Sequence, residues 1–335
     1  MVRVLVAGGA GYIGSHTCKA LAEAGHLPIV YDNLRTGHEW AVRWGPLEQG
    51  DLNDPIALAA AMRRHRPEAV IDFAALAYVG DSMKEPTQYY RTNVAGTISL
   101  LEAMRAHDIT SIVFSSTCAT YGVPARMPIV ETMAQDPINA YGRSKLMAEH
   151  ILRDACAAHG VGAIALRYFN AAGADADGAL GEEHDPEPHL IPLVLQTALG
   201  LRPSIAVFGT DYDTPDGTCV RDYVHVTDLA SAHVAAIEAC RSGSFAAYNL
   251  GTGHGASITE VITRAREITG RPILAEAGPR RPGDPPFLVA DASLARQVLS
   301  WSRQHSDLGH IIETAWRWMT TYRTKAIAAP MRLRS

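Results

Sequence analysis

The sequence has few cysteines, no long apolar run and no strong excess of charge of either sign. Five cysteines stand far apart among 335 residues, at Cys18, Cys118, Cys156, Cys219 and Cys240, and no C-x-x-C pair occurs. An odd number at such spacings argues against a disulfide framework and against a cysteine-based metal site. We therefore expect reduced thiols in a cytoplasmic protein.

The apolar segments are also too short to cross a membrane, which takes roughly 18 consecutive residues. The chain enters a strand-like segment at Met1 without the layout of a signal peptide. A formal net charge of −5 gives no overall attraction to nucleic acid or to an anionic membrane. We expect a protein with neither partner, in which any anionic ligand is held by local groups.

A glycine-rich turn follows the first strand-like segment, residues 2–7. Gly8, Gly11 and Gly14 occupy it, and a helical pattern continues to residue 24. Glycines at this spacing allow a tight turn, close approach of the backbone to a pyrophosphate and close packing of helix on strand. A strand before the turn and a helix after it form the context that a dinucleotide-binding motif requires.

A carboxylate ends the second apolar segment, residues 28–31. Asp32 lies 18 residues beyond Gly14. In this position a carboxylate accepts hydrogen bonds from the ribose hydroxyls of NAD and repels the additional phosphate of NADP. We predict NAD as the cofactor, although Arg35 nearby leaves NADP open.

Strand-like and helical segments alternate through the first half of the chain. Segments 69–75 and 111–116 are strand-like, and segments 56–64 and 89–106 have a helical pattern. This alternation predicts an α/β fold with a doubly wound parallel sheet of the Rossmann type, which binds ligands at the carboxyl ends of its strands.

The 335 residues exceed the usual size of a single domain, and the alternation breaks beyond residue 166 into loops rich in Gly, Pro and Asp. We predict an NAD-binding Rossmann domain over residues 1–167 with returning segments at about 224–253. A smaller, interleaved α/β substrate-binding lobe would take residues 168–223 and 254–322. Residues 323–335 would form a loose tail.

Tyr141 and Lys145 are four residues apart in a segment of helical pattern, so their side chains share one face. A phenol is normally protonated at neutral pH, and a nearby cation favours its ionised form. Lys145 and a bound nicotinamide cation could together lower the pKa of Tyr141 enough to make it a base. The spacing alone is equally compatible with an exposed helix face.

Together these motifs resemble the extended short-chain dehydrogenase/reductase family. They are the three glycines, Asp32-Asn33-Leu34, the segment 114–122 (Phe-Ser-Ser-Thr-x-x-x-Tyr-Gly) and Tyr141-x-x-x-Lys145, and the similarity runs from Val2 to about Trp301. Within the family, the chain is similar to enzymes that epimerise UDP-hexoses at C4. This resemblance implies interconversion of UDP-glucose and UDP-galactose through a 4-keto intermediate, a tightly held NAD, and a homodimer formed through the helices near residues 89–106 and 141–158.

The resemblance also implies the role of each catalytic residue. Tyr141 is the base on the sugar 4-hydroxyl, Thr117 hydrogen-bonds that oxygen, and Lys145 holds the nicotinamide ribose and lowers the pKa of Tyr141. The implied cofactor-binding residues are Gly8, Gly11, Tyr12, Ile13, Gly14, Asp32, Asn33, Thr36, Asp51, Leu52, Phe73, Ala74, Ala75, Asn93, Ser115, Tyr141, Lys145 and Tyr168.

The implied contacts to the UDP-sugar come mainly from the second half of the chain. The residues are Thr117, Tyr141, Asn170, His189, Leu190, Ala206, Phe208, Arg221, Tyr223, Arg281, Asp284 and Leu288. Phe208 would contact the uracil, Asp284 the ribose, and Arg221 and Arg281 the diphosphate. Two arginines suit one diphosphate because a guanidinium offers paired donors and keeps its charge.

Other reactions occur on this scaffold. Dehydratases and UDP-glucuronate decarboxylases of the family carry acidic residues after the catalytic threonine, and here Cys118 and Ala119 stand at those positions. Leu288, at the position that limits sugar bulk, leaves UDP-N-acetylglucosamine and UDP-xylose/UDP-arabinose 4-epimerases open. A non-catalytic NAD-binding or nucleotide-sugar-binding regulator is less favoured because the Tyr/Lys pair is kept. Asp72 departs from the family pattern, in which histidine is common.

Residues 182–189, Glu-Glu-His-Asp-Pro-Glu-Pro-His, have the residue types of a metal site. Their spacing matches no familiar ligand set, and the implied chemistry requires no metal. We therefore predict a solvated acidic loop and no metal.

Overall fold

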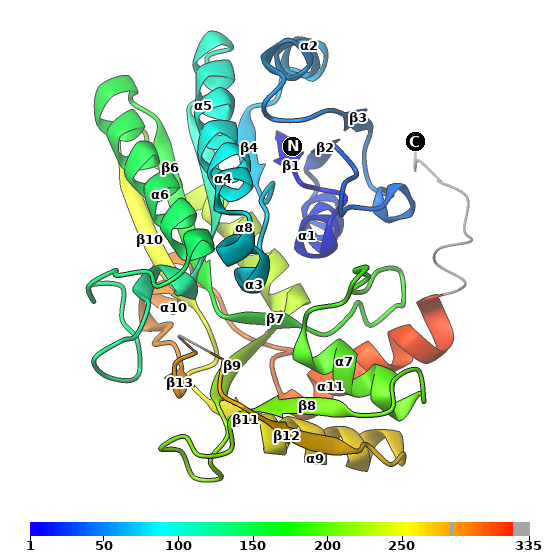
Figure 1. Ribbon diagram of the computed structural model, residues 1–335. Coiled ribbons are helices and arrows are strands. Elements are labelled where there is room, and N and C mark those ends of the chain that lie inside the picture. Colours follow the sequence, from blue (N-terminus) through cyan, green and yellow to red (C-terminus); the bar gives the residue numbers. More distant parts are fainter. Residues whose placement is uncertain (282–283, 324–335) are drawn as a thin grey trace.

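The computed structural model describes residues 1–281 and 284–323, and most of the predicted tail lies outside this range. Within it, seven parallel strands form a large sheet (Figure 1). In sheet order they are β10 (Phe245–Leu250), β6 (Gly162–Tyr168), β5 (Ser111–Thr117), β4 (Ala69–Asp72), β1 (Arg3–Ala7), β2 (Leu27–Asp32) and β3 (Leu47–Gln49). The α/β fold with a doubly wound parallel sheet is confirmed.

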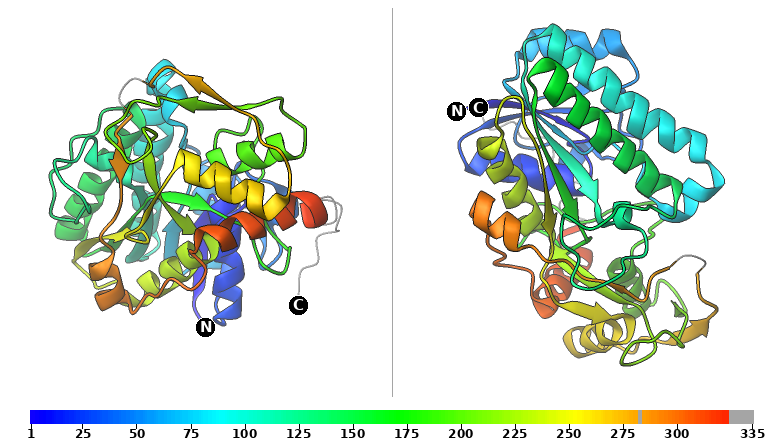
Figure 2. Two further views of the ribbon diagram at one scale, coloured as in Figure 1. Left: turned by 90° about the horizontal axis from the view of Figure 1, so that it is seen from below. Right: turned by 90° about the vertical axis from the view of Figure 1, so that its left-hand side faces the viewer.

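Helices cover both faces of this sheet (Figure 2). One face packs against α2 (Pro55–His65), α5 (Gly96–Ala106) and α6 (Ala140–His159), and the other against α1 (Tyr12–Glu23), α8 (Val226–Ala239) and α10 (Ser293–Leu299). Both faces of the inner strand β1 are therefore buried, and Val4, Leu5 and Val6 are fully enclosed. A continuous apolar strand is what a parallel sheet covered on both sides needs.

A smaller lobe lies beyond the carboxyl ends of the large sheet's strands (Figure 1). Its strands are β7 (Asn170–Ala172), β8 (Ile205–Phe208), β9 (Val220–His225), β11 (Gly255–Ser257), β12 (Ala275–Gly278) and β13 (Phe287–Leu288). Its helices are α7 (Leu190–Ala198), α9 (Ile258–Thr269) and α11 (Leu308–Arg317). The chain returns from this lobe to the large sheet through α8 and β10, so the two lobes are interleaved.

Short elements complete the described chain, and several differ from the predicted segments. They are α3 (Val79–Lys84), α4 (Pro86–Tyr89), the 3₁₀ turns Glu39–Ala41 and Cys118–Tyr121, and the π-helical turns Tyr90–Ala95 and Trp318–Tyr322. The single helix predicted over residues 89–106 is thus divided by a π-helical turn before α5. Strand β3 was not predicted because it has three residues and no apolar alternation.

Candidate active site

The predicted cofactor residues gather along the carboxyl edge of the large sheet. The segment after β1 contributes Gly8, Gly11, Tyr12, Ile13 and Gly14, and the end of β2 with the turn after it contributes Asp32, Asn33 and Thr36. The turn after β3 contributes Asp51 and Leu52, and the turn after β4 contributes Phe73, Ala74 and Ala75. The ends of β5 and β6 contribute Ser115 and Tyr168. Parallel strands bring these distant segments to one edge.

The glycine turn after β1 leaves the amino terminus of α1 open. A Cβ atom on Gly14 would lie 2.2 Å from the carbonyl oxygen of Gly8, so this approach requires glycine. No side chain caps α1, and its first turn carries no acidic residue. Uncapped amides at a helix amino terminus suit an anionic phosphate.

Backbone amides hold the carboxylate of Asp32 in a fixed position. Its oxygens accept hydrogen bonds from the backbone nitrogens of Ala10 and Leu34, at 2.9 Å and 2.8 Å. Asn33 donates to the carboxylate of Asp51 at 2.8 Å. The ends of β2 and β3 are thus linked at the edge where Asp32 is predicted to meet the ribose of the cofactor.

Tyr141 lies in the first turn of α6. The side chain of Asn139 caps this helix by accepting a hydrogen bond from the Gly142 nitrogen at 2.8 Å, which satisfies one amide of the first turn. The phenol is 7% exposed. Burial and the neighbouring Tyr168 raise the pKa of Tyr141, and the Thr117 side chain opposes this increase.

Lys145 points from α6 to the end of β5. Its ammonium donates to the carbonyl oxygen of Ser115 at 2.8 Å and lies 4.5 Å from the centre of the Phe114 ring. Burial lowers the pKa of Lys145 to about 8, and the carboxylates of Asp72 and Glu149 oppose this decrease. The ammonium is thus held at the predicted cofactor edge, beside Ser115, which lies two residues before Thr117 on β5.

Two other predicted cofactor residues use their polar groups on the protein. Asn93 hydrogen-bonds both backbone groups of Leu76 and also donates to Ser144, at 2.9–3.0 Å. The hydroxyls of Ser115 and Tyr168 are 2.6 Å apart. These contacts position the loop after β4 and the end of β6 against the first turns of α6 and the end of β5.

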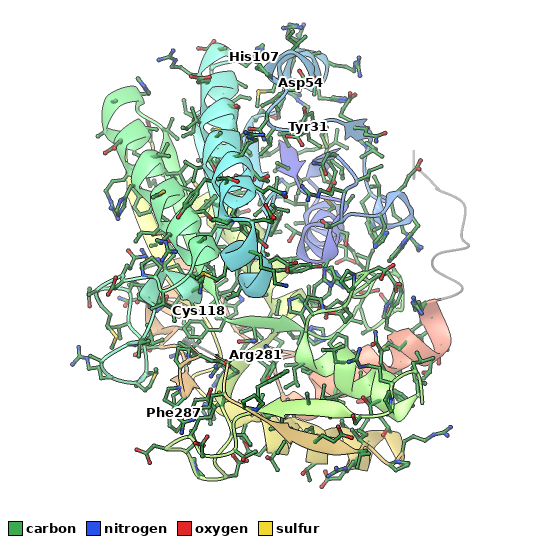
Figure 3. All side chains as sticks on the ribbon, viewed as in Figure 1. Tyr31, Asp54, His107, Cys118, Arg281 and Phe287 are labelled. Atoms are coloured by element: carbon green, nitrogen blue, oxygen red, sulfur yellow. The ribbon has the colours of Figure 1, made fainter. Side chains whose placement is uncertain are left out.

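The predicted uracil platform lies on strand β8. Ala206 and Phe208 face the exposed side of this strand, whereas its alternate residues are buried. The guanidinium of Arg281 covers the Phe208 ring at 4.0 Å from the ring centre. Figure 3 labels Arg281 in the smaller lobe, below Cys118, which follows β5.

Arg221 and Asp284, predicted for the diphosphate and the ribose, form an ion pair with each other. The next strand, β13, pairs in parallel with β9 and sets Leu288 opposite Arg221. Leu288 packs against a cluster that contains Cys118 and Phe169. The structure therefore brings Arg221, predicted to contact the diphosphate, and Leu288, predicted to limit sugar bulk, together near the end of β5.

Asn170 lies in register with Tyr223, in the pairing of β7 with β9.

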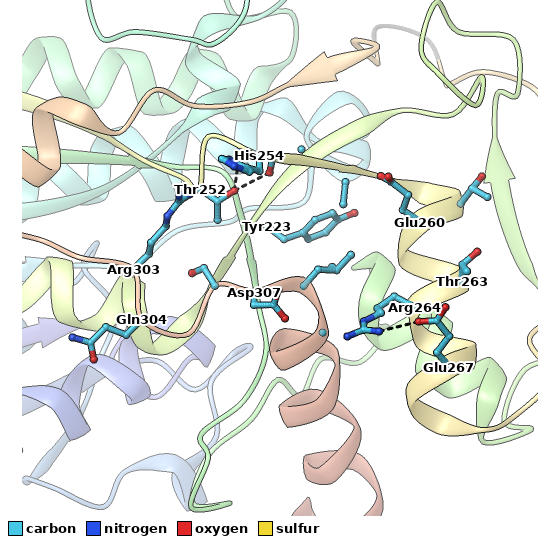
Figure 4. Close-up of a pocket in the computed structure, with 16 residues that line it drawn as sticks. Tyr223, Thr252, His254, Glu260, Thr263, Arg264, Glu267, Arg303, Gln304 and Asp307 are labelled. Carbon is cyan, nitrogen blue, oxygen red and sulfur yellow. Dashed lines mark hydrogen bonds and ion pairs between the residues drawn. The ribbon is translucent and has the colours of Figure 1, made fainter.

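Tyr223 also lines a pocket of about 840 Å³, bounded by α9, β11 and the start of α11 (Figure 4). Thr252, Arg264 and Asp307 are among the other lining residues. Of the residues predicted to contact substrate, only Tyr223 lines this pocket. The pocket therefore does not mark the site built on Tyr141, and a substrate contact by Tyr223 stays a prediction.

Residues 4–251 match the model of the NAD dependent epimerase/dehydratase family. The chain belongs to this family. It is 51% identical over 316 residues to a UDP-glucose 4-epimerase of Rhizobium meliloti (strain 1021), covering 94% of this chain and 96% of that protein.

Solved structures of the family extend this similarity to three dimensions. The crystal structure of UDP-glucose 4-epimerase from Brucella ovis in complex with NAD has a TM-score of 0.91 and 54% identity, covering 94% of this chain and 98% of that one. The UDP-Glc/GlcNAc 4-epimerase from Campylobacter jejuni has a TM-score of 0.83 and 40% identity, covering 95% and 99%.

A buried ion pair behind the family's Tyr/Lys pair was missed from the sequence. Glu149 on α6 and Arg167 on β6 are fully buried and 2.6 Å apart at their nearest oxygen and nitrogen atoms. Ser116 and Tyr121 complete the network through hydrogen bonds of 2.6 Å and 2.8 Å. No local spacing predicts this pair because its members lie 18 residues apart on different elements.

The loop of residues 182–189 differs from its prediction. Asp185, Pro186 and Pro188 are exposed, as expected of a solvated loop. The side chains of Glu182 and Glu187, however, are only 6% and 5% exposed. The prediction was wrong for these two glutamates because Tyr12 and Tyr78, distant in sequence, pack beside the loop's histidines.

Proposed function

We propose that this chain is an isomerase that epimerises a UDP-hexose at C4 with NAD, interconverting UDP-glucose and UDP-galactose through a 4-keto intermediate. The observation that carries this proposal is the meeting of Tyr141, Lys145 and Thr117 at the end of β5. The open glycine turn lies on the same carboxyl edge of the large sheet. The relatives from Rhizobium meliloti and Brucella ovis are named as UDP-glucose 4-epimerases.

The glycine turn, Asp32 and Lys145 fit NAD. The open α1 terminus suits the diphosphate, the fixed Asp32 carboxylate suits a ribose without 2′-phosphate, and the Lys145 ammonium would hold the nicotinamide ribose. A dinucleotide held by these residues would supply reversible hydride acceptance at C4 of the sugar.

Tyr141 moves the proton in this reaction. Its phenolate oxygen takes the proton of the sugar 4-hydroxyl as hydride leaves C4, and returns it when the 4-keto sugar is reduced. Thr117 donates a hydrogen bond to the oxygen at C4 of the sugar. Because burial raises the pKa of Tyr141, the phenolate needs the nearby nicotinamide cation as well as Lys145.

The rest of the site holds UDP while the keto sugar turns. Arg221 and Arg281 supply the charge for the diphosphate, and Phe208 and Asp284 contact the nucleoside. Arg281 covers the Phe208 ring in the present conformation. Binding of uracil on that ring would displace the guanidinium toward the phosphates.

The test is the variant Tyr141→Phe, which keeps the ring and removes the proton-transferring oxygen. We expect turnover of UDP-galactose, measured on protein that contains NAD, to fall by at least roughly a hundredfold. Tyr90→Phe is the control, because the Tyr90 hydroxyl accepts a long hydrogen bond, 3.4 Å, from Arg143 and has no other hydrogen-bond partner in the described part of the chain. Retained turnover in Tyr141→Phe would contradict the proposal.

Leu288, which lies opposite Arg221, favours UDP-N-acetylglucosamine as a second substrate. Leu288 is partly buried against Cys118 and lacks a hydroxyl group. It is smaller than a tyrosine, which would exclude an N-acetyl group at this position. We expect some activity on UDP-N-acetylglucosamine, and no turnover at saturating substrate would contradict this. UDP-xylose and UDP-arabinose need the same machinery and stay open.

The assembly we propose is a cytoplasmic homodimer. Ile98 on α5 and Met147 on α6 are 41% and 44% exposed on the two helices that the resemblance assigns to the interface. Five free thiols fit a reducing compartment. Among the described residues, no helix is long and apolar enough to span a membrane.

A further inference from the structure

Four side chains of the loop before α7 converge on one point. Glu182, His184, Glu187 and His189 each offer a ligand atom, and all four atoms lie within 4.8 Å of one another. We call these four residues the loop cluster. None of them has a part in the proton transfer or hydride transfer proposed above, although His189 is also a predicted substrate contact.

Three of the four side chains of the loop cluster are largely enclosed by the protein, and His189 stands at its open side. The side chains of Glu182 and Glu187 are 6% and 5% exposed, and that of His184 is 14% exposed. The rings of Tyr12 and Tyr78 pack edge-on against His184, at 6.4 Å and 6.0 Å between centres. Two carboxylates in such a place need positive charge beside them.

Hydrogen bonds within the loop cluster do not account fully for this arrangement. Nδ1 of His184 is buried and lies 3.2 Å and 3.5 Å from oxygens of Glu182 and Glu187, close enough for ion pairs but without good hydrogen-bond geometry to any described residue. Nδ1 of His189 lies 3.3 Å from an oxygen of Glu187. An enclosed nitrogen thus points between two carboxylates without a donor–acceptor geometry to either.

These separations fit ligands that share one cation. Zinc binds nitrogen and carboxylate oxygen at about 2.0–2.2 Å in tetrahedral sites, which sets neighbouring ligand atoms about 3.3–3.5 Å apart. Three of the four separations that join a histidine nitrogen to a glutamate oxygen fall at or close to this value, with Glu187 using a different oxygen toward each histidine. The fourth, between His189 Nδ1 and Glu182 at 2.5 Å, is a direct hydrogen bond. It would have to open by roughly 0.8 Å when a cation enters. The four candidate ligand atoms spread over up to 4.8 Å, so they would draw together around a cation.

We propose that the loop cluster is a structural site for a divalent transition-metal cation, with Zn²⁺ as the best match. Two imidazole nitrogens disfavour Mg²⁺ and Ca²⁺, which prefer oxygen ligands. Two glutamates balance the charge of the dication, and four protein ligands leave no open position for catalysis.

The site would fix the segment that leads into the substrate lobe. His189 directly precedes α7, and the loop also contacts the Rossmann side, where His38 Nε2 lies 2.9 Å from the carbonyl oxygen of Glu183. A cation held by residues before and at the start of α7 would hold this loop against Tyr12 and Tyr78. It would leave Nε2 of His189, whose side chain is 45% exposed, free for the substrate.

Cobalt binding to the intact, NAD-containing protein tests this proposal without reference to turnover. The protein is stripped with a chelator, titrated with Co²⁺ and followed by visible absorption, since tetrahedral cobalt absorbs much more strongly than octahedral cobalt. Zn²⁺ binding is then measured by calorimetry and by metal analysis after gel filtration. Glu187→Gln removes one ligand, and Glu183→Gln is the matched control because Glu183 pairs with Arg323 instead.

We expect one Co²⁺ per chain with a tetrahedral spectrum, displaced by Zn²⁺. Affinity should fall by at least about tenfold in Glu187→Gln and stay unchanged in Glu183→Gln. Weak octahedral-type absorption, binding below one equivalent, or equal affinity in both variants would overturn the proposal. Retained NAD and an unchanged circular dichroism spectrum establish that each variant is folded.

Discussion

At the scale of single residues, Asp72 departs from the family pattern and lies close to Lys145. One carboxylate oxygen accepts a hydrogen bond from Ala74, and the other has no partner among the described residues. Asp72 pairs with Phe114 across β4 and β5, and the Lys145 ammonium lies on that ring. Asp72 is therefore placed to influence the charge of Lys145.

We predict that Asp72→Asn moves the alkaline limb of the pH–kcat profile to lower pH. In the native chain, burial lowers the pKa of Lys145 to about 8 and the Asp72 carboxylate opposes this. Without that carboxylate the pKa of Lys145 falls further, so the ammonium loses its proton at lower pH. Asp136→Asn, on an exposed loop, is the control. A limb that is unmoved, or that shifts to higher pH, would argue against this role.

Arg281 and Arg280 give a matched pair for testing the UDP contact. We predict that Arg281→Ala weakens UDP binding by roughly ten- to a hundredfold, since a hydrogen bond to a charged group contributes about 1.5–3 kcal/mol. Arg280 covers Tyr212 and pairs with Asp211, so Arg280→Ala should leave UDP affinity nearly unchanged. Calorimetry measures both, and equal dissociation constants for Arg281→Ala and the native protein would refute the assignment.

At the scale of elements, α6 is fixed to the sheet by the buried Glu149–Arg167 pair. We predict that Arg167→Met lowers the free energy of unfolding by about 3–5 kcal/mol, because it leaves the Glu149 carboxylate buried without its partner. The double variant with Glu149→Leu should recover most of this loss. Denaturant titration measures both, and a double variant less stable than Arg167→Met would contradict the explanation.

Elements whose signal is local in sequence were predictable. Gly8, Gly11 and Gly14 follow an apolar strand, and Tyr141 and Lys145 lie one helical turn apart, so the Rossmann sheet and the placement of the Tyr/Lys pair on one helix could be read from spacing. Strand β3 could not, because it gains its strand character by pairing with β2. The burial of Glu182 and Glu187 likewise depends on Tyr12 and Tyr78, which only the folded chain brings there.

At the scale of the whole molecule, the exposed apolar side chains on α5 and α6 bear on assembly. We predict a dimer in light scattering, and a shift toward monomer for Ile98→Glu combined with Met147→Glu, because two buried charges would oppose association. Leu294→Glu, at another exposed apolar position, is the control. A monomeric native protein would contradict the proposed assembly.

In the proposed reaction, resident NAD and Tyr141 together complete a closed cycle of oxidation and reduction at C4. The most direct measurement is an NMR time course of the purified protein with UDP-galactose and no added cofactor. We expect UDP-glucose to appear and the two sugars to reach equilibrium without net change in NAD. Absence of UDP-glucose, even after NAD⁺ is added, would contradict the proposed reaction.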